Sequence, residues 1–216
     1  ICEGLVGSEM CIRDSRNIRI SIMTDPAFDK ADQTILPPRD ADRDDDTIDF
    51  GFRTIQRADK ARMVRGVFDS VADRYDIMND VMSGGIHRLW KAAMIDWMAP
   101  QPHQKLIDLA GGTGDISLRF LRGGGGEACI SDINHAMLAA GRGRRDLQRL
   151  AHRLSWCVAN AESLPFDDHS ADFVTIAFGL RNVTDRQAAL YEAYRILKPG
   201  GRFLCLEFSH VQSRPL

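Results

Sequence analysis

A glycine-rich turn with an acid at each end is the part of this sequence best suited to chemistry. Residues 108–115 read Asp-Leu-Ala-Gly-Gly-Thr-Gly-Asp and directly follow Leu106 and Ile107. Glycine accepts positive φ and lets the backbone approach a ligand closely. The N–H groups at the start of the following helix point into the same gap. This pattern predicts a nucleotide-like ligand at the carboxyl edge of a parallel sheet.

The residues of the turn narrow the class of ligand. The turn has no Lys-Ser/Thr pair, so it is not a phosphate loop of the nucleotide-triphosphatase type, and its spacing is not the G-x-G-x-x-G of dinucleotide sites. Asp108 and Asp115 would repel a pyrophosphate. Such a turn suits a ligand with a cationic or zwitterionic part.

Two more strand ends complete the outline of a ligand. Asp132 lies about 20 residues beyond the turn, where an acid can accept both hydroxyls of a ribose. A helix N-cap is the alternative, but Asn134 would serve that purpose by itself. Asn160 and Ala161 follow the next strand, where a polar contact and space for an adenine ring are expected, although a plain polar turn fits equally well. Together these residues fit S-adenosylmethionine, with the acidic glycine turn holding its amino-acid part.

Alternating strands and helices are expected to position these residues. Strands are predicted at 105–109, 127–131, 154–159, 172–178 and 202–208, and helices at 115–122, 134–150 and 185–197. The strands are apolar without strict alternation, which is typical of a buried parallel sheet. The order predicts a doubly wound, Rossmann-like α/β sheet. The four glycines at 123–126 favour a flexible turn over a second ligand loop.

The chain divides into three parts by composition. Residues 1–49 are predicted to be a disordered or artefactual tail. Residues 1–22 show no sustained helix or strand period before a more natural start at Met23, and 39–46 is a run of charges. Residues 50–100 are predicted to form a helical cap over the carboxyl edge of the sheet, and 101–216 the ligand-binding core. An apolar helix face is formed by Trp90, Met94, Trp97 and Met98, for which core packing is favoured over a channel or a membrane contact.

Composition excludes several classes of function. The 216 residues suffice for one α/β domain, and a net charge of −2 gives no reason to expect nucleic acid as a partner. The five cysteines have no metal-ligand spacing, so no metal site is predicted. No transmembrane run or signal peptide is apparent, which favours a cytoplasmic protein.

Three longer motifs lie at 75–90, 179–184 and 195–209. Through these motifs the chain resembles one family, the ubiquinone/menaquinone biosynthesis C-methyltransferases, over about residues 50–212. The resemblance implies a class I S-adenosylmethionine-dependent methyltransferase fold. Ala177 stands where the family often has a serine that contacts the cofactor. The family also normally continues beyond residue 216 with a helix and a strand hairpin, which are missing here. The implied cofactor-binding set is Asp108, Gly111, Gly112, Thr113, Gly114, Asp132, Asn160 and Ala161.

The resemblance also implies a reaction and its acceptor. The family moves a methyl group from S-adenosylmethionine to a ring carbon of a polyprenylated quinol, which needs a base or a group that stabilises a phenolate. Arg181 is the first candidate, with ion pairing to Asp185 or Asp115 as its structural alternative. His87 and Tyr75 are the other candidates, with packing roles as alternatives. The isoprenoid tail implies peripheral contact with the inner face of the membrane.

Other functions stay open at this point. The rivals are an O- or N-methyltransferase of another small molecule, a nicotinamide-dependent oxidoreductase, which the missing G-x-G-x-x-G disfavours, and a non-catalytic cofactor-binding subunit of a quinone-synthesis complex. The sequence does not separate benzoquinol from naphthoquinol, or a homodimer from assembly into such a complex.

Overall fold

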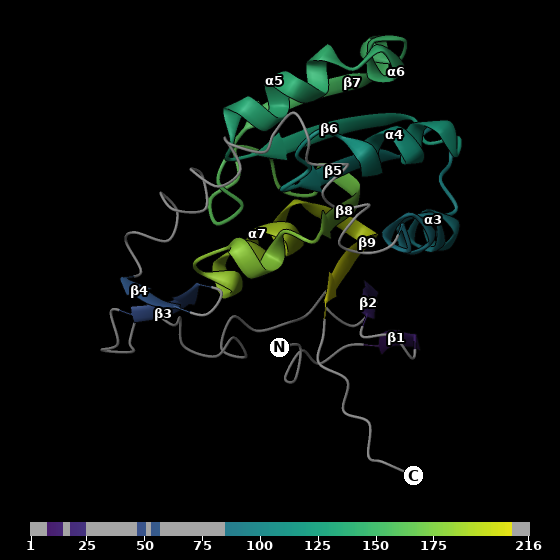
Figure 1. Ribbon diagram of the computed structural model, residues 1–216. Coiled ribbons are helices and arrows are strands. Elements are labelled where there is room, and N and C mark those ends of the chain that lie inside the picture. Colours follow the sequence, from purple (N-terminus) through teal and green to yellow (C-terminus); the bar gives the residue numbers. More distant parts are fainter. Residues whose placement is uncertain (1–7, 15–17, 25–46, 51–52, 57–84, 209–216) are drawn as a thin grey trace.

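A parallel sheet forms the centre of the computed structural model, which describes residues 8–14, 18–24, 47–50, 53–56 and 85–208, with side chains for 85–207. Within these residues seven strands form one sheet in the order β1-β2-β9-β8-β5-β6-β7, and β3 and β4 form a separate pair (Figure 1). The strands β5 to β9 are mutually parallel. Their bounds are Lys105–Leu109 for β5, Glu127–Asp132 for β6, Leu154–Val158 for β7, Ala171–Ala177 for β8 and Leu197–Phe208 for β9.

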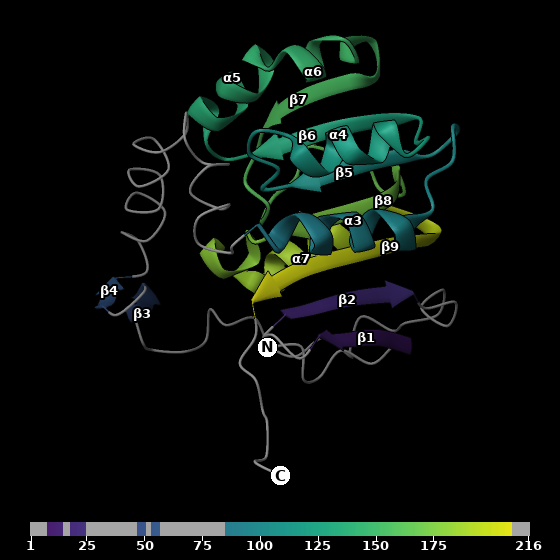
Figure 2. The ribbon, with the colours of Figure 1, turned by 45° about the vertical axis from the view of Figure 1, so that its right-hand side comes forward.

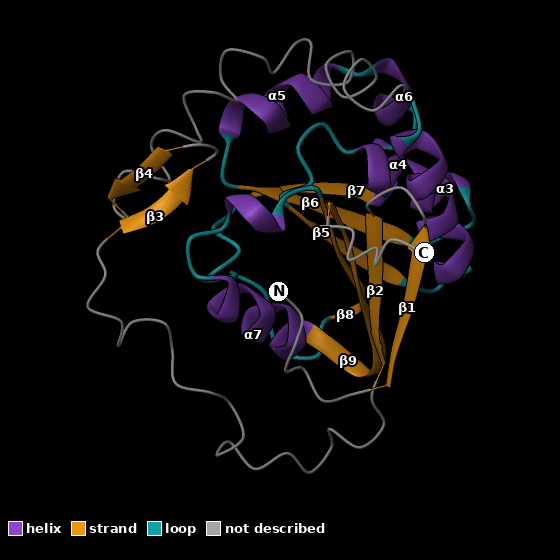
Figure 3. Ribbon diagram, turned by 60° about the horizontal axis from the view of Figure 1, so that its bottom comes forward, coloured by secondary structure: helices purple, strands orange, loops and turns teal. Residues whose placement is uncertain are grey.

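Helices cover both faces of this sheet. On one side lie α3 and α4, and on the other lies α7 (Figures 2 and 3). No helix among the described residues is long and apolar enough to cross a bilayer. The helix bounds are His87–Met98 for α3, Asp115–Arg122 for α4, His135–Gly143 for α5, Arg145–Gln148 for α6 and Arg186–Ile196 for α7.

The core consists of two layers, one on each face of the sheet. Side chains of α3 and α4 pack on one face, where Phe120 and Phe173 meet edge to face at 5.9 Å between ring centroids. Side chains of α7, among them Ala193 and Ile196, pack on the other face with Val174. Because both faces are covered, the central strands are apolar throughout, and this produces the unbroken apolar runs of the sequence.

The predicted α/β order is confirmed, with shifted boundaries. All five parallel strands are present, but β9 begins at Leu197, before an irregularity in its pairing with β8, instead of at residue 202. The single helix predicted at 134–150 is wrong. The chain instead forms α5 and α6, separated by the extended residue Arg144, whose guanidinium binds Asp146 and the carbonyl of Thr113.

The first 56 residues differ from the prediction of a tail without regular structure. Ser8–Asp14 (β1) and Ile18–Thr24 (β2) form strands, and β2 pairs antiparallel with the outer edge of β9. The sequence does carry the period-2 signal over 18–22, where isoleucine alternates with Arg19 and Ser21. Thr47–Phe50 (β3) and Arg53–Gln56 (β4) pair antiparallel, so part of the segment predicted as a helical cap is strand.

The described part of the predicted cap is α3, and it does not lie over the carboxyl edge of the sheet. It packs beside α4 on the face of the sheet, because Met94 and Met98, both 0% exposed, belong to the same apolar layer as Phe173. Arg202 of β9 donates to the carbonyls of Trp97 and Met98 and thereby caps the carboxyl end of α3. The prediction of core packing for this apolar face is confirmed. Residues 57–84 of the predicted cap lie outside the described residues.

Candidate active site

The glycine turn links the end of β5 to the start of α4 and is held by its own backbone. The Gly111 N–H donates to the carbonyl of Ser131 at 3.0 Å, and the Gly114 N–H donates to the carbonyl of Gly111 at 2.9 Å. A Cβ on Gly111 would lie 2.9 Å from the carbonyl oxygen of Asp108. Gly114 has a φ of 84°, which favours glycine, and begins α4. The sequence therefore needs glycine at 111 and 114 for two different reasons, close packing and backbone conformation.

Asp108 lies beneath this turn and not on its surface. Its side chain is 1% exposed, and each carboxylate oxygen accepts a hydroxyl hydrogen bond, from Thr175 of β8 at 2.7 Å and from Ser117 of α4 at 3.1 Å. Burial raises the pKa of Asp108 to about 6, and the two hydroxyls and Lys91 offset part of that shift. Asp108 therefore ties β5, β8 and α4 together under the turn.

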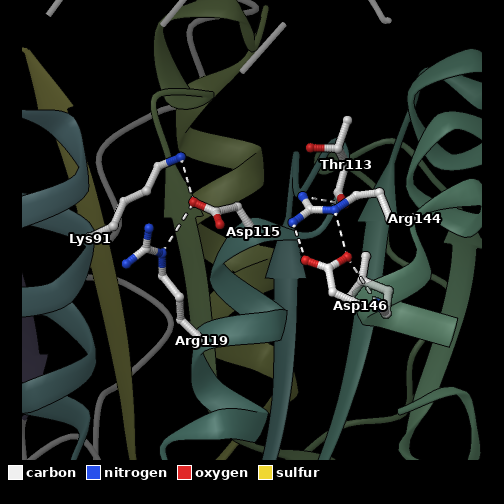
Figure 4. Close-up of polar contacts among 7 residues, drawn as sticks. Lys91, Thr113, Asp115, Arg119, Arg144 and Asp146 are labelled. Carbon is white, nitrogen blue, oxygen red and sulfur yellow. Dashed lines mark hydrogen bonds and ion pairs between the residues drawn. The ribbon is translucent and has the colours of Figure 1, made fainter. Parts of the chain in front are cut away.

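Asp115, the acid at the other end of the turn, is ion-paired. Its Oδ2 lies 2.9 Å from Nζ of Lys91 on α3 and 3.2 Å from Nε of Arg119 (Figure 4). Burial opposes ionisation of Asp115, but these two cations outweigh it and hold the pKa below its usual range. The electrostatic argument from the sequence counted Asp115 as a free negative charge, and this is wrong because protein cations already neutralise it.

Asp132 ends β6 beside the turn. Its Oδ2 accepts the Gly112 N–H at 2.9 Å, and its Oδ1 accepts the Asn134 N–H at 2.8 Å. Burial raises the pKa of Asp132, and the backbone N–H groups offset part of that rise. The side chain of Asn134 caps α5 by accepting from Ala136 and Met137. As the sequence predicted, Asn134 caps the helix without Asp132, and each carboxylate oxygen of Asp132 has a second lone pair.

The chain after β7 turns back through Asn160. The exposed side chain of Asn160 accepts the Glu162 N–H at 3.1 Å, which is the polar turn that the sequence left open as an alternative. The Ala159 N–H donates to the carbonyl of Asp132 at 3.1 Å, so this loop lies next to the end of β6. Asn160 and Ala161 are therefore close to Asp132, as the sequence predicted for two parts of one site.

The chain after β8 touches the glycine turn. Phe178 has a φ of 58°, unusual for a bulky residue, and a Cβ on Gly179 would lie 2.6 Å from Cβ of Ala110. Two residues later, Arg181 lies in a 3-10 turn (Leu180–Asn182), and its guanidinium pairs with the carboxylate of Glu207 on β9. The sequence had considered Asp185 and Asp115 as partners of Arg181, but not Glu207.

The other two predicted catalytic candidates are His87 and Tyr75. His87 is the first residue of α3 and is 6% exposed, which matches the packing alternative considered for it. Tyr75 lies outside the described residues.

Thr113 is 7% exposed, and its carbonyl oxygen accepts from Nη1 of Arg144 at 3.4 Å, so the turn also contacts the start of α6 (Figure 4).

Several residues that hold the site were missed by the sequence reasoning. Thr175 is a single hydroxyl in an apolar strand, and Ser117 interrupts an apolar stretch of α4, so each could have indicated a buried polar partner. Lys91 is a cation among the apolar residues of α3, and it is 6% exposed. Glu162 and Glu207 carry no such signal, because acids are common in loops and at strand ends.

Comparison with known proteins decides the family. The ubiE/COQ5 methyltransferase family matches residues 55–216, which include the glycine turn, Asp132 and Arg181. The chain belongs to this family.

Two relatives illustrate how similar the family members are. The ubiquinone/menaquinone biosynthesis C-methyltransferase UbiE of Acidiphilium cryptum is 58% identical over 172 residues, which is 80% of this chain and 69% of that protein. The protein of the same name from Cereibacter sphaeroides is also 58% identical over 172 residues, 79% of this chain and 69% of its own length.

A solved structure supports the fold. A putative S-adenosyl-L-methionine-dependent methyltransferase from Methanococcus maripaludis superposes with a TM-score of 0.53 over 73% of this chain and 66% of that one, at 17% identity. At that identity the likeness speaks for the fold alone, the class I Rossmann-like sheet of methyltransferases.

Proposed function

We propose that this protein transfers a methyl group from S-adenosylmethionine to a ring carbon of a polyprenylated quinol in ubiquinone or menaquinone biosynthesis. The observation that carries the proposal is the 58% identity with two proteins named as C-methyltransferases of that biosynthesis. The family match includes both the glycine turn and the segment after β8, so it covers donor and acceptor sides alike.

The residues present fit S-adenosylmethionine. A Cβ on Gly111 would be 3.0 Å from Oδ2 of the buried Asp108, so glycine lets the turn pack directly on this carboxylate. Asp132 offers a carboxylate with accepting capacity for the ribose hydroxyls, and Asn160 and Ala161 lie beside it. When bound, S-adenosylmethionine supplies a methyl group already activated by the sulfonium. The protein therefore needs to hold and orient donor and acceptor and to favour the deprotonated acceptor.

Arg181 is the residue proposed to stabilise the phenolate form of the quinol. Its side chain is 44% exposed and paired with Glu207, and the residue lies on the segment that contacts the glycine turn. A guanidinium binds an anionic oxygen through short, charge-assisted hydrogen bonds, which stabilise phenolate over phenol. The burial of His87 favours a packing role for that residue. Tyr75 stays a candidate for orienting the quinol oxygen.

The direct test is the identity of the methylated product. The purified protein is incubated with methyl-labelled S-adenosylmethionine and demethylated benzoquinol and naphthoquinol analogues with short isoprenoid tails. We expect a new carbon–methyl bond, located by mass spectrometry and NMR, and the preferred analogue identifies the ring. An O-methyl product would overturn the proposal. Binding of S-adenosylhomocysteine without any turnover would favour a non-catalytic subunit.

Variants at residue 181 test the proposed catalytic group. Arg181→Ala should lower kcat by roughly 100-fold, because removing one electrostatic stabiliser of a developing anion typically has that effect. Arg181→Lys should recover part of the rate, since an ammonium retains the charge but not the planar fork. An unchanged kcat in Arg181→Ala would mean that another group stabilises the phenolate.

We also propose that the protein associates peripherally with the inner face of the membrane, because the isoprenoid tail of its acceptor stays in the bilayer. Flotation with phospholipid vesicles, with and without a polyprenyl quinone, tests this. We expect the protein to float with the quinone-loaded vesicles. Its absence from both vesicle fractions would contradict membrane association.

A further inference from the structure

Glu162 joins two loops of the site that the strands leave separate. It lies in the loop after β7, and its Oε1 accepts the N–H of Thr184 at 2.9 Å and the N–H of Asp185 at 3.1 Å. Both of these residues belong to the chain between β8 and α7. One carboxylate oxygen thus bridges the loop beside Asp132 and the segment that carries Arg181.

The loop around Glu162 is itself fixed. The Glu162 N–H donates to the side chain of Asn160, and the Ser163 N–H donates to the carbonyl of Asn160 at 3.0 Å. Upstream, the Ala159 N–H donates to the carbonyl of Asp132. A shift of the residues beside Asp132 therefore moves Glu162 as well, because no unbound stretch of chain lies between them.

One of the two amides bound by Glu162 belongs to the N-cap residue of α7, and the other precedes it. That helix begins at Arg186, and its N-cap Asp185 accepts the Ala188 N–H at 2.9 Å through its own side chain. The N–H of an N-cap residue is often bound by a carboxylate of the same helix, but here Glu162 binds it from another loop. The bond from Glu162 thus fixes the segment before the helix, which runs back to Arg181.

We infer that Glu162 is a positioning residue that transmits occupancy of the donor site to the acceptor-side segment 179–185. This inference rests on the proposed function for the assignment of the two sides. Ligand contact at Asn160 and Ala161 holds the loop, Glu162 holds Thr184 and Asp185, and Arg181 is brought into register between these amides and Glu207. Coupling of this kind is reciprocal, so the acceptor must also tighten donor binding.

Amide hydrogen exchange of the full chain tests the inference. Exchange is measured with and without S-adenosylhomocysteine, and mass spectrometry detects it in peptides that cover 179–188. We expect the ligand to slow exchange there in the wild-type protein. Glu162→Ala should exchange about tenfold faster without ligand, because hydrogen bonds to a charged acceptor are lost, and should show no ligand-dependent slowing while calorimetry still shows binding. Glu162→Gln keeps the Oε1 acceptor and should retain the slowing.

Glu192→Ala is the matched control. Glu192 of α7 accepts the Leu164 N–H at 2.7 Å, so it also joins α7 to the loop after β7, but it does not contact 184–185. This variant should keep the ligand-dependent slowing. Slowing that persists in Glu162→Ala, or is absent from the wild-type protein with ligand bound, would overturn the inference.

Kinetics give a second readout that a merely structural role would not move. In Glu162→Ala the KM for the quinol at saturating S-adenosylmethionine should rise about tenfold, while the affinity for S-adenosylhomocysteine measured without quinol changes little. A comparable loss of S-adenosylhomocysteine affinity without quinol would contradict transmission between the sites. Normal ligand-dependent slowing in a wild-type protein that makes no carbon-methylated quinol would overturn the proposed function and leave the inference about Glu162 standing.

Discussion

The two ends of the glycine turn carry the same acid in opposite surroundings. Asp108 is 1% exposed and bonded to neutral groups, among them two hydroxyls, and burial raises its pKa to about 6. Asp115 is bound to two cations that keep its pKa low despite burial. An uncharged partner satisfies hydrogen bonds but repays little of the cost of burying a charge, whereas a cation repays more of it. Identical residues in one motif therefore have different roles: Asp108 joins strands and α4 beneath the turn, and Asp115 joins α3 to α4.

The largest expected effect is the removal of Asp108. Asp108→Ala leaves the buried hydroxyls of Thr175 and Ser117 without their acceptor and opens a cavity, which should lower the unfolding free energy by about 4 kcal/mol. Asp108→Asn fills the same space, and the two hydroxyls can rotate to bond with its amide. This variant should therefore lower the unfolding free energy much less. Urea unfolding at neutral pH measures both. Equal losses in the two variants would contradict the hydroxyl network.

The pH dependence of stability should have opposite signs at the two acids. The folded pKa of Asp108 is raised from 3.8 to about 6, so its contribution is full below pH 3.8 and is lost as the pH rises through 6. The unfolding free energy of the wild-type protein relative to Asp108→Asn should thus fall by about 3 kcal/mol across that window, at about 1.4 kcal/mol per unit.

The contribution of Asp115 runs the other way. Its folded pKa is lowered, so its contribution is present above pH 3.8 and is lost as the pH falls below that value. The stability of the wild-type protein relative to Asp115→Asn should therefore decline only in acid. If the stability differences for Asp108→Asn and Asp115→Asn changed with pH in the same direction, the proposed distinction between the two acids would be wrong.

Replacing Lys91 should destabilise the protein less than replacing Asp108. Lys91→Met leaves Asp115 with Arg119 as its remaining cation, so we expect a loss of about 2 kcal/mol in unfolding free energy, below the range for a fully buried pair. Lys198→Met is the matched control, because its pair with Asp172 has a lysine side chain that is 41% exposed, and it should cost less than about 1 kcal/mol. A cycle with Asp115→Asn isolates the coupling between Lys91 and Asp115, and zero coupling would contradict the pair.

Replacing Arg119 should have the smallest effect on the unfolding free energy. It lies one turn after Asp115 on the same helix and is 29% exposed, and such pairs are worth about 0.5 kcal/mol. Arg119→Ala should therefore shift the urea midpoint only slightly. A loss as large as that of Lys91→Met would mean that the two cations share the charge of Asp115 equally.

Much of the fold could be read from the sequence because its patterns are local. Apolar runs separated by helical periods located all five parallel strands, and Asn134 was recognisable as a helix cap from its position alone. The break at Arg144 was missed because it depends on contacts of its side chain with Asp146 and Thr113. The strands β1 and β2 were missed because the alternation at 18–22 is too short to count as a sustained period.

The candidate site was predictable to a different extent on its two sides. On the donor side, the sequence placed the glycine turn and Asp132 together, and they do lie together because they follow the neighbouring parallel strands β5 and β6. On the acceptor side, the partner of Arg181 was not predictable, because Glu207 lies 26 residues away and only the pairing of β8 with β9 brings it near.

The sequence by itself determined the α/β order, the glycine turn and the family, since each depends on residue types at fixed short spacings. Only the tertiary structure decided what the acids of the site do. The packing of strands and helices around each acid determines whether a carboxylate meets hydroxyls, cations or backbone N–H groups. For that reason Asp108 lies buried on hydroxyls, Asp115 is neutralised by Lys91, and Glu162 bonds to the segment of Arg181.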